Sequence, residues 1–292
     1  AVQQPLLYGI AAVILALFLG PSLIGLIVFT IGPIAASLGL SFTNWDLLTP
    51  PKLVGVRNFT TMLSDAEFWR TLRNTITFLV GYIPLVLTAG LLIAVLLNSA
   101  IPFKQAFRAM YFVPVVTSWV AVALVWKWLF NPAYGLINSA LGAIGIAGPA
   151  WLFDPSWAMV AVIITSVWKD TGFIMVILLA GLQGIPREYY EAASIDGANR
   201  AQGLRHITIP LLAPAMIFCL SISLIGSFQV FDQVYVMTEG GPAGATMVLV
   251  ERIVANAFSY SRMGYASSMS WVLFLLIFIV TFFFYRLRKW QA

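Results

Sequence analysis

Four polar or charged residues interrupt apolar stretches of the chain and are the residues best placed to do chemistry. Lys169 and Asp170 are neighbours within the apolar segment 157–182, and Gln229 and Asp232 are three positions apart in a later one. Ionisable groups in apolar surroundings are costly and usually face a protein interior or a water-filled cavity. The four side chains could therefore line the path of a polar solute, or they could form structural contacts between helices.

The spacing of these residues predicts how they pair. Adjacent residues on an α-helix point about 100° apart, so a direct contact between Lys169 and Asp170 is geometrically poor. Each is expected to have a partner on another helix or another subunit. Gln229 and Asp232 have the i, i+3 spacing that places two side chains on one helix face, which is expected to meet protein or water rather than lipid.

The sequence lacks the motifs of ATP hydrolysis, zinc-dependent proteolysis and serine hydrolysis. It contains no G-x-x-x-x-G-K-[ST] loop, no H-E-x-x-H and no G-x-S-x-G. One histidine and one cysteine cannot build a His/Cys zinc site. We therefore predict no catalytic residue, no metal site and no cofactor in this chain, so any ATP must be hydrolysed elsewhere.

The composition is that of an integral membrane protein. Hydrophobic residues make up 61% of the 292 positions and charged residues only 9%, against about 25% charged in soluble domains. Several apolar runs exceed the ~20 residues that cross a bilayer core. We predict an all-α membrane protein with six spans, at residues 18–42, 74–97, 109–130, 157–182, 209–237 and 263–285.

The first apolar run, residues 5–42, is too long for one upright crossing at ~1.5 Å per residue. Gly20-Pro21 could break it. We expect an apolar, tilted or interfacial extension at 1–17, with a separate seventh span as the alternative. The remaining organisation is predicted as a first span and outside loop at 18–70, a core at 71–286 and a basic tail at 287–292.

The distribution of Lys and Arg predicts the orientation. With a cytoplasmic N-terminus, the inner segments carry eight of these residues and the outer segments six, which has the sign of the positive-inside rule. Both termini are then cytoplasmic, and the loops 43–73, 131–156 and 238–262 lie outside. The net charge of +5 fits this topology and needs no nucleic acid to explain it.

The polar segment 186–210 separates two apolar runs on the predicted cytoplasmic side. Pro186 can begin a helix, Asp196-Gly197 predicts a corner because Gly readily adopts positive φ, and Pro210 opens the next span. We expect two short helices bent at Gly197, a shape that suits docking of a cytoplasmic partner. An ordinary interfacial loop is the alternative.

The same segment, "EAASIDGANRAQGLRHITIP", resembles the EAA loop of bacterial ABC importer permeases. The matching positions are Glu191, Ala192, Ala193, Gly197, Ile207 and Pro210, with Ile209 where Leu is usual. The resemblance implies that this loop, including Asp196 at its corner, forms the coupling helices that fit a cleft on the ATP-binding subunit.

Further stretches resemble permeases of the carbohydrate-uptake branch, which includes maltose-type and glycerol-phosphate-type systems. They include "SFTNW", "VGVRNF", "YFVPVV", "AGLQGIP", "FQVFDQVYVMTEGGP" and "GYASSMS". Within that branch the chain is similar to the first of two permease subunits. The resemblance implies the six-helix transmembrane domain of a type I importer in the bacterial cytoplasmic membrane.

The implied complex contains a second homologous permease, two ATP-binding cassette subunits that bind ATP and Mg, and an extracytoplasmic solute-binding protein. It would import a sugar or sugar-like solute, with Lys169, Asp170, Gln229 and Asp232 near the path. The outside loops, above all 238–262, are expected to meet the binding protein, and residues 247–258 look amphipathic. A stand-alone ion-coupled secondary transporter is the alternative, in which Lys169, Asp170 and Asp232 could relay protons.

Overall fold

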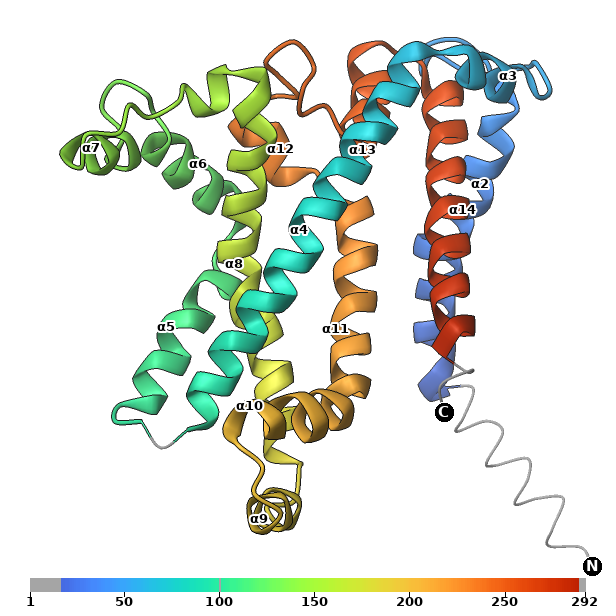
Figure 1. Cartoon of the computed structure of the whole chain (residues 1–292). Helices are drawn as coiled ribbons and strands as arrows, with labels where there is room; N and C mark the ends of the chain where they lie inside the picture. Colours follow the sequence, from blue (N-terminus) through green and yellow to red (C-terminus); the bar gives the residue numbers. More distant parts are fainter. Residues whose placement is uncertain (1–16, 100, 289–292) are drawn as a thin grey trace, which may run out of the picture. The chain divides into compact units, whose positions relative to one another are not determined.

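The computed structural model describes residues 17–99 and 101–288, which are mainly α-helical (Figure 1). Two two-residue strands, β1 (Thr43–Asn44) and β2 (Lys52–Leu53), pair antiparallel. The α-helices are α2 (Gly32–Ser41), α3 (Arg57–Ser64), α4 (Ala66–Asn98), α5 (Lys104–Val116), α6 (Trp119–Leu129), α7 (Leu136–Ala143), α8 (Pro155–Gln183), α9 (Glu188–Ile195), α10 (Arg200–Gly203), α11 (Ile209–Phe228), α12 (Asp232–Met237), α13 (Leu249–Val254) and α14 (Met263–Arg288).

The predicted membrane spans are present as helices. Among the described residues, five continuous helices are long and apolar enough to cross a bilayer, at Leu17–Ser41, Ala66–Asn98, Pro155–Gln183, Arg200–Phe228 and Met263–Phe284. A bent pair, α5 and α6, passes the same test when the two helices are taken together, which gives six when the pair is counted as one span. The all-α, six-span prediction is therefore confirmed, and nearly all of the predicted extension 1–17 lies outside the described residues.

The third span departs from a single rod. Helices α5 and α6 meet at an angle of 102°, because Thr117 and Ser118 between them are extended, with ψ of 141° and 138°. In the sequence the polar pair Thr117-Ser118 stands at this bend, but the apolar residues on either side of it read as one span over 109–130.

The fifth span starts earlier and ends sooner than residues 209–237. Its helix begins at Arg200, and a π-helical turn at Leu204–Thr208 precedes Pro210, whose ring and missing N–H disfavour a regular turn. The helix ends at Phe228, and Phe231 has φ of −148° before α12 begins. The prediction that Gln229 and Asp232 share one helix face is therefore wrong.

The chain divides into two compact units. Of the described residues, the first unit contains 17–65 and 253–274. Within it, Tyr265 donates to Asp65 at 2.9 Å and the Trp271 indole donates to Ser37 at 3.2 Å. These bonds fasten the start of α14 to the first span and to the loop after it.

The second unit contains the described residues 66–99, 101–252 and 275–288. Its core is the packing of α4 and α11 on α8 (Figure 1). Glycines permit the close approaches, since a Cβ at Gly90 would lie 2.5 Å from Ile174 and one at Gly172 would lie 1.9 Å from the Tyr111 carbonyl oxygen. This unit contains all the predicted site residues.

Candidate functional site

A polar cavity of about 260 Å³ lies where the chain breaks after α11. Its walls come from α4, α5, α6, α8 and α11 and from residues 229–233. Three of the four predicted path residues line it, namely Asp170, Gln229 and Asp232. Gln229 and Asp232 therefore line the same cavity. They do so because the chain breaks between them, and not because they share a helix face as predicted.

Hydrogen bonds fix the deeper polar groups of this cavity. Tyr82 donates to the Asp170 carboxylate at 2.9 Å, and the buried Gln233 amide donates to Ser166 at 3.3 Å. Aromatic residues Trp119, Phe173 and Phe231 form much of the remaining wall. Polar groups with fixed orientation beside aromatic faces are the usual composition of a small-solute site.

Tyr82 is a cavity residue that the sequence analysis did not predict. It sits in a long apolar run, where a tyrosine is read as a hydrophobic residue. The available signal was its phenolic hydroxyl, because a buried Tyr O–H usually has a hydrogen-bond partner. The residue is only 6% exposed, so that partner had to be another protein group.

Lys169 does not line the polar cavity. Its ammonium group donates to the Val115 carbonyl at 3.1 Å and lies 4.8 Å from the centre of the Trp119 ring. Asp170 instead binds Tyr82 on α4. The prediction that each of the two neighbours has its partner on another helix is confirmed.

The segment predicted to couple to an ATPase is a helix, a corner and a second helix. Helix α9 ends at Ile195, Gly197 has φ of +79°, and α10 starts with a capping box between Asn199 and Gln202. The corner at Gly197 is confirmed, whereas the second helix is continuous with the fifth span rather than separate.

The predicted coupling residues mostly face solvent. Of the seven, Ala193 and Ile207 are half-buried and the others exposed, namely Glu191, Ala192, Asp196, Gly197 and Pro210. Ile195 is 87% exposed and Tyr189 is 53% exposed. Apolar side chains this exposed on a polar segment, together on one short helix, indicate a surface for another protein.

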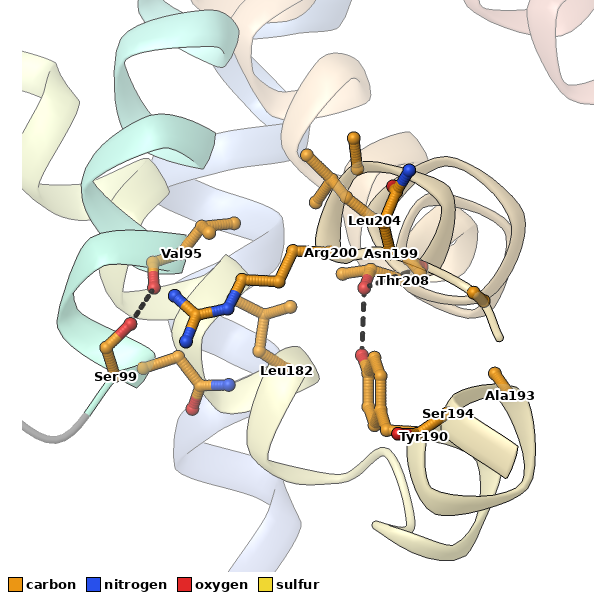
Figure 2. Close-up of a pocket in the computed structure, with 14 residues that line it drawn as sticks. Val95, Ser99, Leu182, Tyr190, Ala193, Ser194, Asn199, Arg200, Leu204 and Thr208 are labelled. Carbon is orange, nitrogen blue, oxygen red and sulfur yellow. Dashed lines mark hydrogen bonds between the residues drawn. The ribbon is translucent and has the colours of Figure 1, made fainter. Parts of the chain in front are cut away.

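A second cavity, of about 550 Å³, lies behind this segment. The ends of α4 and α8 form one side of it, and residues of α9, α10 and the π-helical turn form the other (Figure 2). The Tyr190 and Thr208 hydroxyls are hydrogen-bonded at 2.9 Å and tie α9 to the start of the fifth span. Helix α9 is thus connected to that span by a side-chain contact as well as by the corner.

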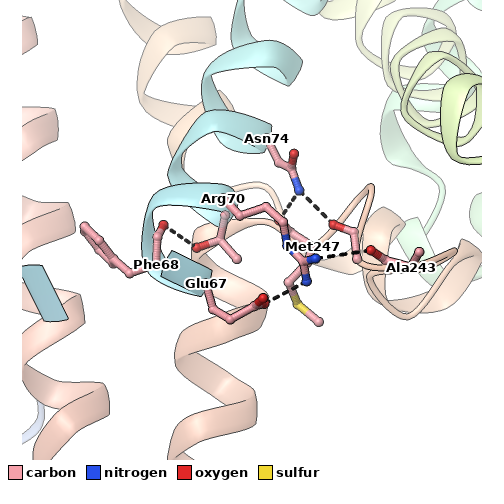
Figure 3. Close-up of polar contacts among 8 residues, drawn as sticks. Glu67, Phe68, Arg70, Asn74, Ala243 and Met247 are labelled. Carbon is pink, nitrogen blue, oxygen red and sulfur yellow. Dashed lines mark hydrogen bonds and ion pairs between the residues drawn. The ribbon is translucent and has the colours of Figure 1, made fainter. Parts of the chain in front are cut away.

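The loop 238–247 is fastened to the first turns of α4. Arg70 pairs with Glu67 at 2.7 Å and donates to the Ala243 carbonyl at 3.3 Å. Asn74 donates to the carbonyls of Gly244 and Met247 at 2.9 and 3.0 Å (Figure 3). The loop is therefore held in a defined shape.

Glu251, on α13 just after this loop, is a buried carboxyl group. The residue is 5% exposed and lies outside the spans. Burial and the nearby charge of Glu239 raise the pKa of Glu251 to about 7, from 4.5. Because the folded-state pKa is the higher one, the stabilisation is complete below pH 4.5 and is lost as pH rises through 7.

We expect the melting temperature of the purified protein to fall by roughly 3–6 °C between pH 5.5 and 8 through this residue. Glu251→Gln should remove that part of the pH dependence, and Glu239→Gln should shift it to lower pH. Thermal unfolding in detergent across the pH range measures both. Identical pH profiles for the wild type and Glu251→Gln would show that Glu251 does not titrate in this range.

Comparisons with known proteins identify the family. The sequence profile described as "Binding-protein-dependent transport system inner membrane component" matches residues 86–292. The chain is 39% identical to the probable ABC transporter permease protein YesP of Bacillus subtilis, covering 92% of this chain and 88% of that one. It is 38% identical to the lactose transport system permease protein LacF of Rhizobium radiobacter, covering 94% and 93%.

The fold also matches a solved structure. A chain in the crystal structure of a bacterial ABC transporter involved in the import of the acidic polysaccharide alginate superposes with a TM-score of 0.85, at 23% identity, over 98% of this chain and 99% of that chain. The helix order, the extent of the profile match and the relatives agree with one another. The chain therefore belongs to the family of inner-membrane components of binding-protein-dependent transport systems and is a multi-pass ABC transporter permease.

Proposed function

We propose that this chain is a permease subunit of an ATP-driven importer that moves a sugar or sugar-like solute inward. The observation that carries the proposal is the exposed helix-corner-helix segment 188–203, whose apolar side chains need a partner. The names of similar permeases support the solute class, since they include lactose transport and trehalose/maltose transport. ATP and Mg belong, in this proposal, to the partner subunits.

The segment would couple transport to ATP hydrolysis by fitting into a cleft on an ATP-binding subunit. Glu191, Ala192 and Ala193 would contribute the docking helix, and Asp196 and Gly197 the corner. Ile207 and Pro210 would form the start of the span that the docked subunit moves. This assignment places the segment in the cytoplasm, with both termini on the same side of the bacterial cytoplasmic membrane.

The polar cavity would form part of the solute path. Sugars bind through several hydrogen bonds and through stacking on aromatic faces, and this cavity offers carboxylate and amide groups beside five aromatic rings. Asp170, Gln229 and Asp232 would contact the solute or its water. A second homologous permease would complete the path.

The fastened loop 238–247 would meet an extracytoplasmic binding protein on the opposite side of the membrane. Its rigid attachment to α4 by Arg70 and Asn74 is the property that supports this role, since pre-organised loops bind partners at lower entropic cost. The assembly would comprise two permeases, two ATP-binding cassette subunits and the binding protein, with no nucleic acid.

The proposal is tested by reconstituting the complex in liposomes with Gly197→Pro in this chain. Proline fixes φ near −65°, whereas Gly197 has φ of +79°, so the corner cannot form. We expect solute-stimulated ATP hydrolysis to fall at least about tenfold while the spans stay inserted. Glu191→Lys, which reverses an exposed charge on the docking helix, should act in the same direction.

Gly203→Ala is the matched control for this experiment. Gly203 lies in the same segment but has a helical φ of −58°, and its added methyl group would meet only Tyr190 at 3.9 Å. We expect coupling near that of the wild type. Normal coupling in Gly197→Pro would contradict the docking role, and transport by the purified chain alone under an ion gradient would establish a secondary transporter instead.

A further inference from the structure

We propose that Lys169 is a positioning residue that holds the bend between α5 and α6 and thereby shapes the wall of the polar cavity. The expected effect on transport rests on the proposed function. The role of Lys169 in the bend depends only on contacts within the second unit. Lys169 is 4% exposed and touches both sides of the bend, at Val115 and at Trp119.

The bend leaves carbonyl groups at the end of α5 without helical partners. In a continuous helix the Val115 carbonyl would accept from the N–H of Trp119, four residues later. Thr117 caps two of the freed groups, because its hydroxyl donates to Val113 at 3.0 Å and its N–H donates to Pro114 at 3.2 Å. Lys169 supplies the donor for Val115 itself, at 3.1 Å.

The charge of Lys169 suits this position as well as its hydrogen bond. The C-terminal end of a helix carries partial negative charge, so a cation there is stabilising. The ring of Trp119, the first residue of α6, presents its π face to the same ammonium group at 4.8 Å. One side chain on α8 therefore binds the last turn of α5 and the first turn of α6.

Helix α8 is a firm support for this contact. One turn beyond Lys169, Gly172 lets the backbone of α5 approach so closely that a Cβ would lie 1.9 Å from the Tyr111 oxygen. Helices α5 and α8 therefore contact each other at two places, where Gly172 meets Tyr111 and where Lys169 meets Val115. The position of α5 on α8 is fixed, and Lys169 sets where the chain leaves α5.

The bend in turn sets the cavity wall. Val115 and Trp119 line the cavity directly. Helix α6 packs on α12, where Lys127 donates to the Val236 carbonyl at 3.3 Å, and α12 carries Asp232 and Gln233 into the same cavity. Movement of α6 would therefore displace polar groups on which solute binding depends.

The test compares Lys169→Met with Lys169→Arg by two measurements on the assembled complex. The first is a pulsed electron resonance distance between spin labels at Leu124→Cys on α6 and Ile164→Cys on α8, in a Cys219→Ala background. Both label sites are exposed, at 55% and 37%. The second is the apparent KM and maximal rate of solute transport.

We expect Lys169→Met to shift or broaden the α6–α8 distance and to raise the apparent KM roughly tenfold, because binding groups tolerate displacements of only about 0.5 Å. Lys169→Arg keeps the charge and the donor and should preserve the wild-type distance with a near-normal KM. If Lys169→Met does not assemble, Lys169→Gln, which keeps a donor without the charge, should show the same broadening in milder form.

An unchanged distance in Lys169→Met together with a raised KM would overturn the proposal and make Lys169 a solute contact. An unchanged distance with an unchanged KM would overturn it too. If the wild-type complex transports no sugar-like solute, the proposed function fails, while the distance measurement still decides whether Lys169 holds the bend.

Discussion

Gly172→Ala is expected to prevent recovery of a folded permease. A methyl group at this position would lie 1.9 Å from the backbone oxygen of Tyr111, and backbone cannot move aside as a flexible side chain can. Overpacked sites typically cost 1–3 kcal/mol and occasionally more, and we expect at least about 3 kcal/mol here because α5 must separate from α8. Fluorescence-detected size-exclusion chromatography after heating measures the loss.

Gly226→Ala is the control for that substitution. Gly226 lies inside α11, and a methyl group there would have nothing within 4 Å. Alanine also has the better helix propensity, by about 1 kcal/mol. We expect Gly226→Ala to be at least as stable as the wild type, and a stable Gly172→Ala protein would disprove the close packing of α5 on α8.

Asp170→Ala is expected to reduce solute transport at least about tenfold without loss of assembly. The substitution removes an acceptor from the polar cavity and leaves the buried Tyr82 hydroxyl unpaired, a cost of about 1–3 kcal/mol. Tyr82→Phe should have a smaller effect, because it removes the donor but leaves the carboxylate free to accept from solute. Uptake of radiolabelled sugar into proteoliposomes measures each change.

Two further variants separate solute binding from stability. Asp154→Asn alters a carboxylate at the start of α8, the helix that also carries Asp170. The Asp154 side chain accepts from the N–H of Ser156, and asparagine can cap equally well. Uptake should be normal. Asp232 is exposed at the cavity, so Asp232→Ala should lower uptake without lowering the melting temperature, and normal uptake in both Asp170→Ala and Asp232→Ala would exclude a path through this cavity.

Membrane spans and the corner at Gly197 could be predicted from the sequence because each rests on a local property. A span needs only a sufficient length of apolar residues, and a corner needs a residue that tolerates positive φ. The separate partners of Lys169 and Asp170 followed from helix periodicity alone. The spans, the corner and the separation of the two partners do not depend on which helices pack together.

The bend after Val116 and the break after Phe228 could not be predicted. Polar residues stand at both places, Thr117-Ser118 at the bend and Gln229 at the break. Membrane helices also carry such residues without breaking, so tertiary contacts decide between a straight and a broken helix. At the bend, the donor that replaces the lost helical hydrogen bond comes from Lys169, 54 positions along the chain from Val115. Three of the four residues predicted near a solute path line one cavity, but the sequence did not supply the geometry that brings them together.

The helix Arg200–Phe228 spans the distance between the Gly197 corner and the polar cavity without interruption. Its 29 residues extend about 43 Å at ~1.5 Å per residue. We expect any tilt of this helix to centre on the irregular turn at Leu204–Thr208 near its start. The helix extends about 35 Å from that turn to Gln229, so a tilt of about 5° there would move Gln229 through roughly 3 Å, about the length of a hydrogen bond. If the chain works as proposed, a small displacement at the corner would then reach the side chains that line the cavity at the other end.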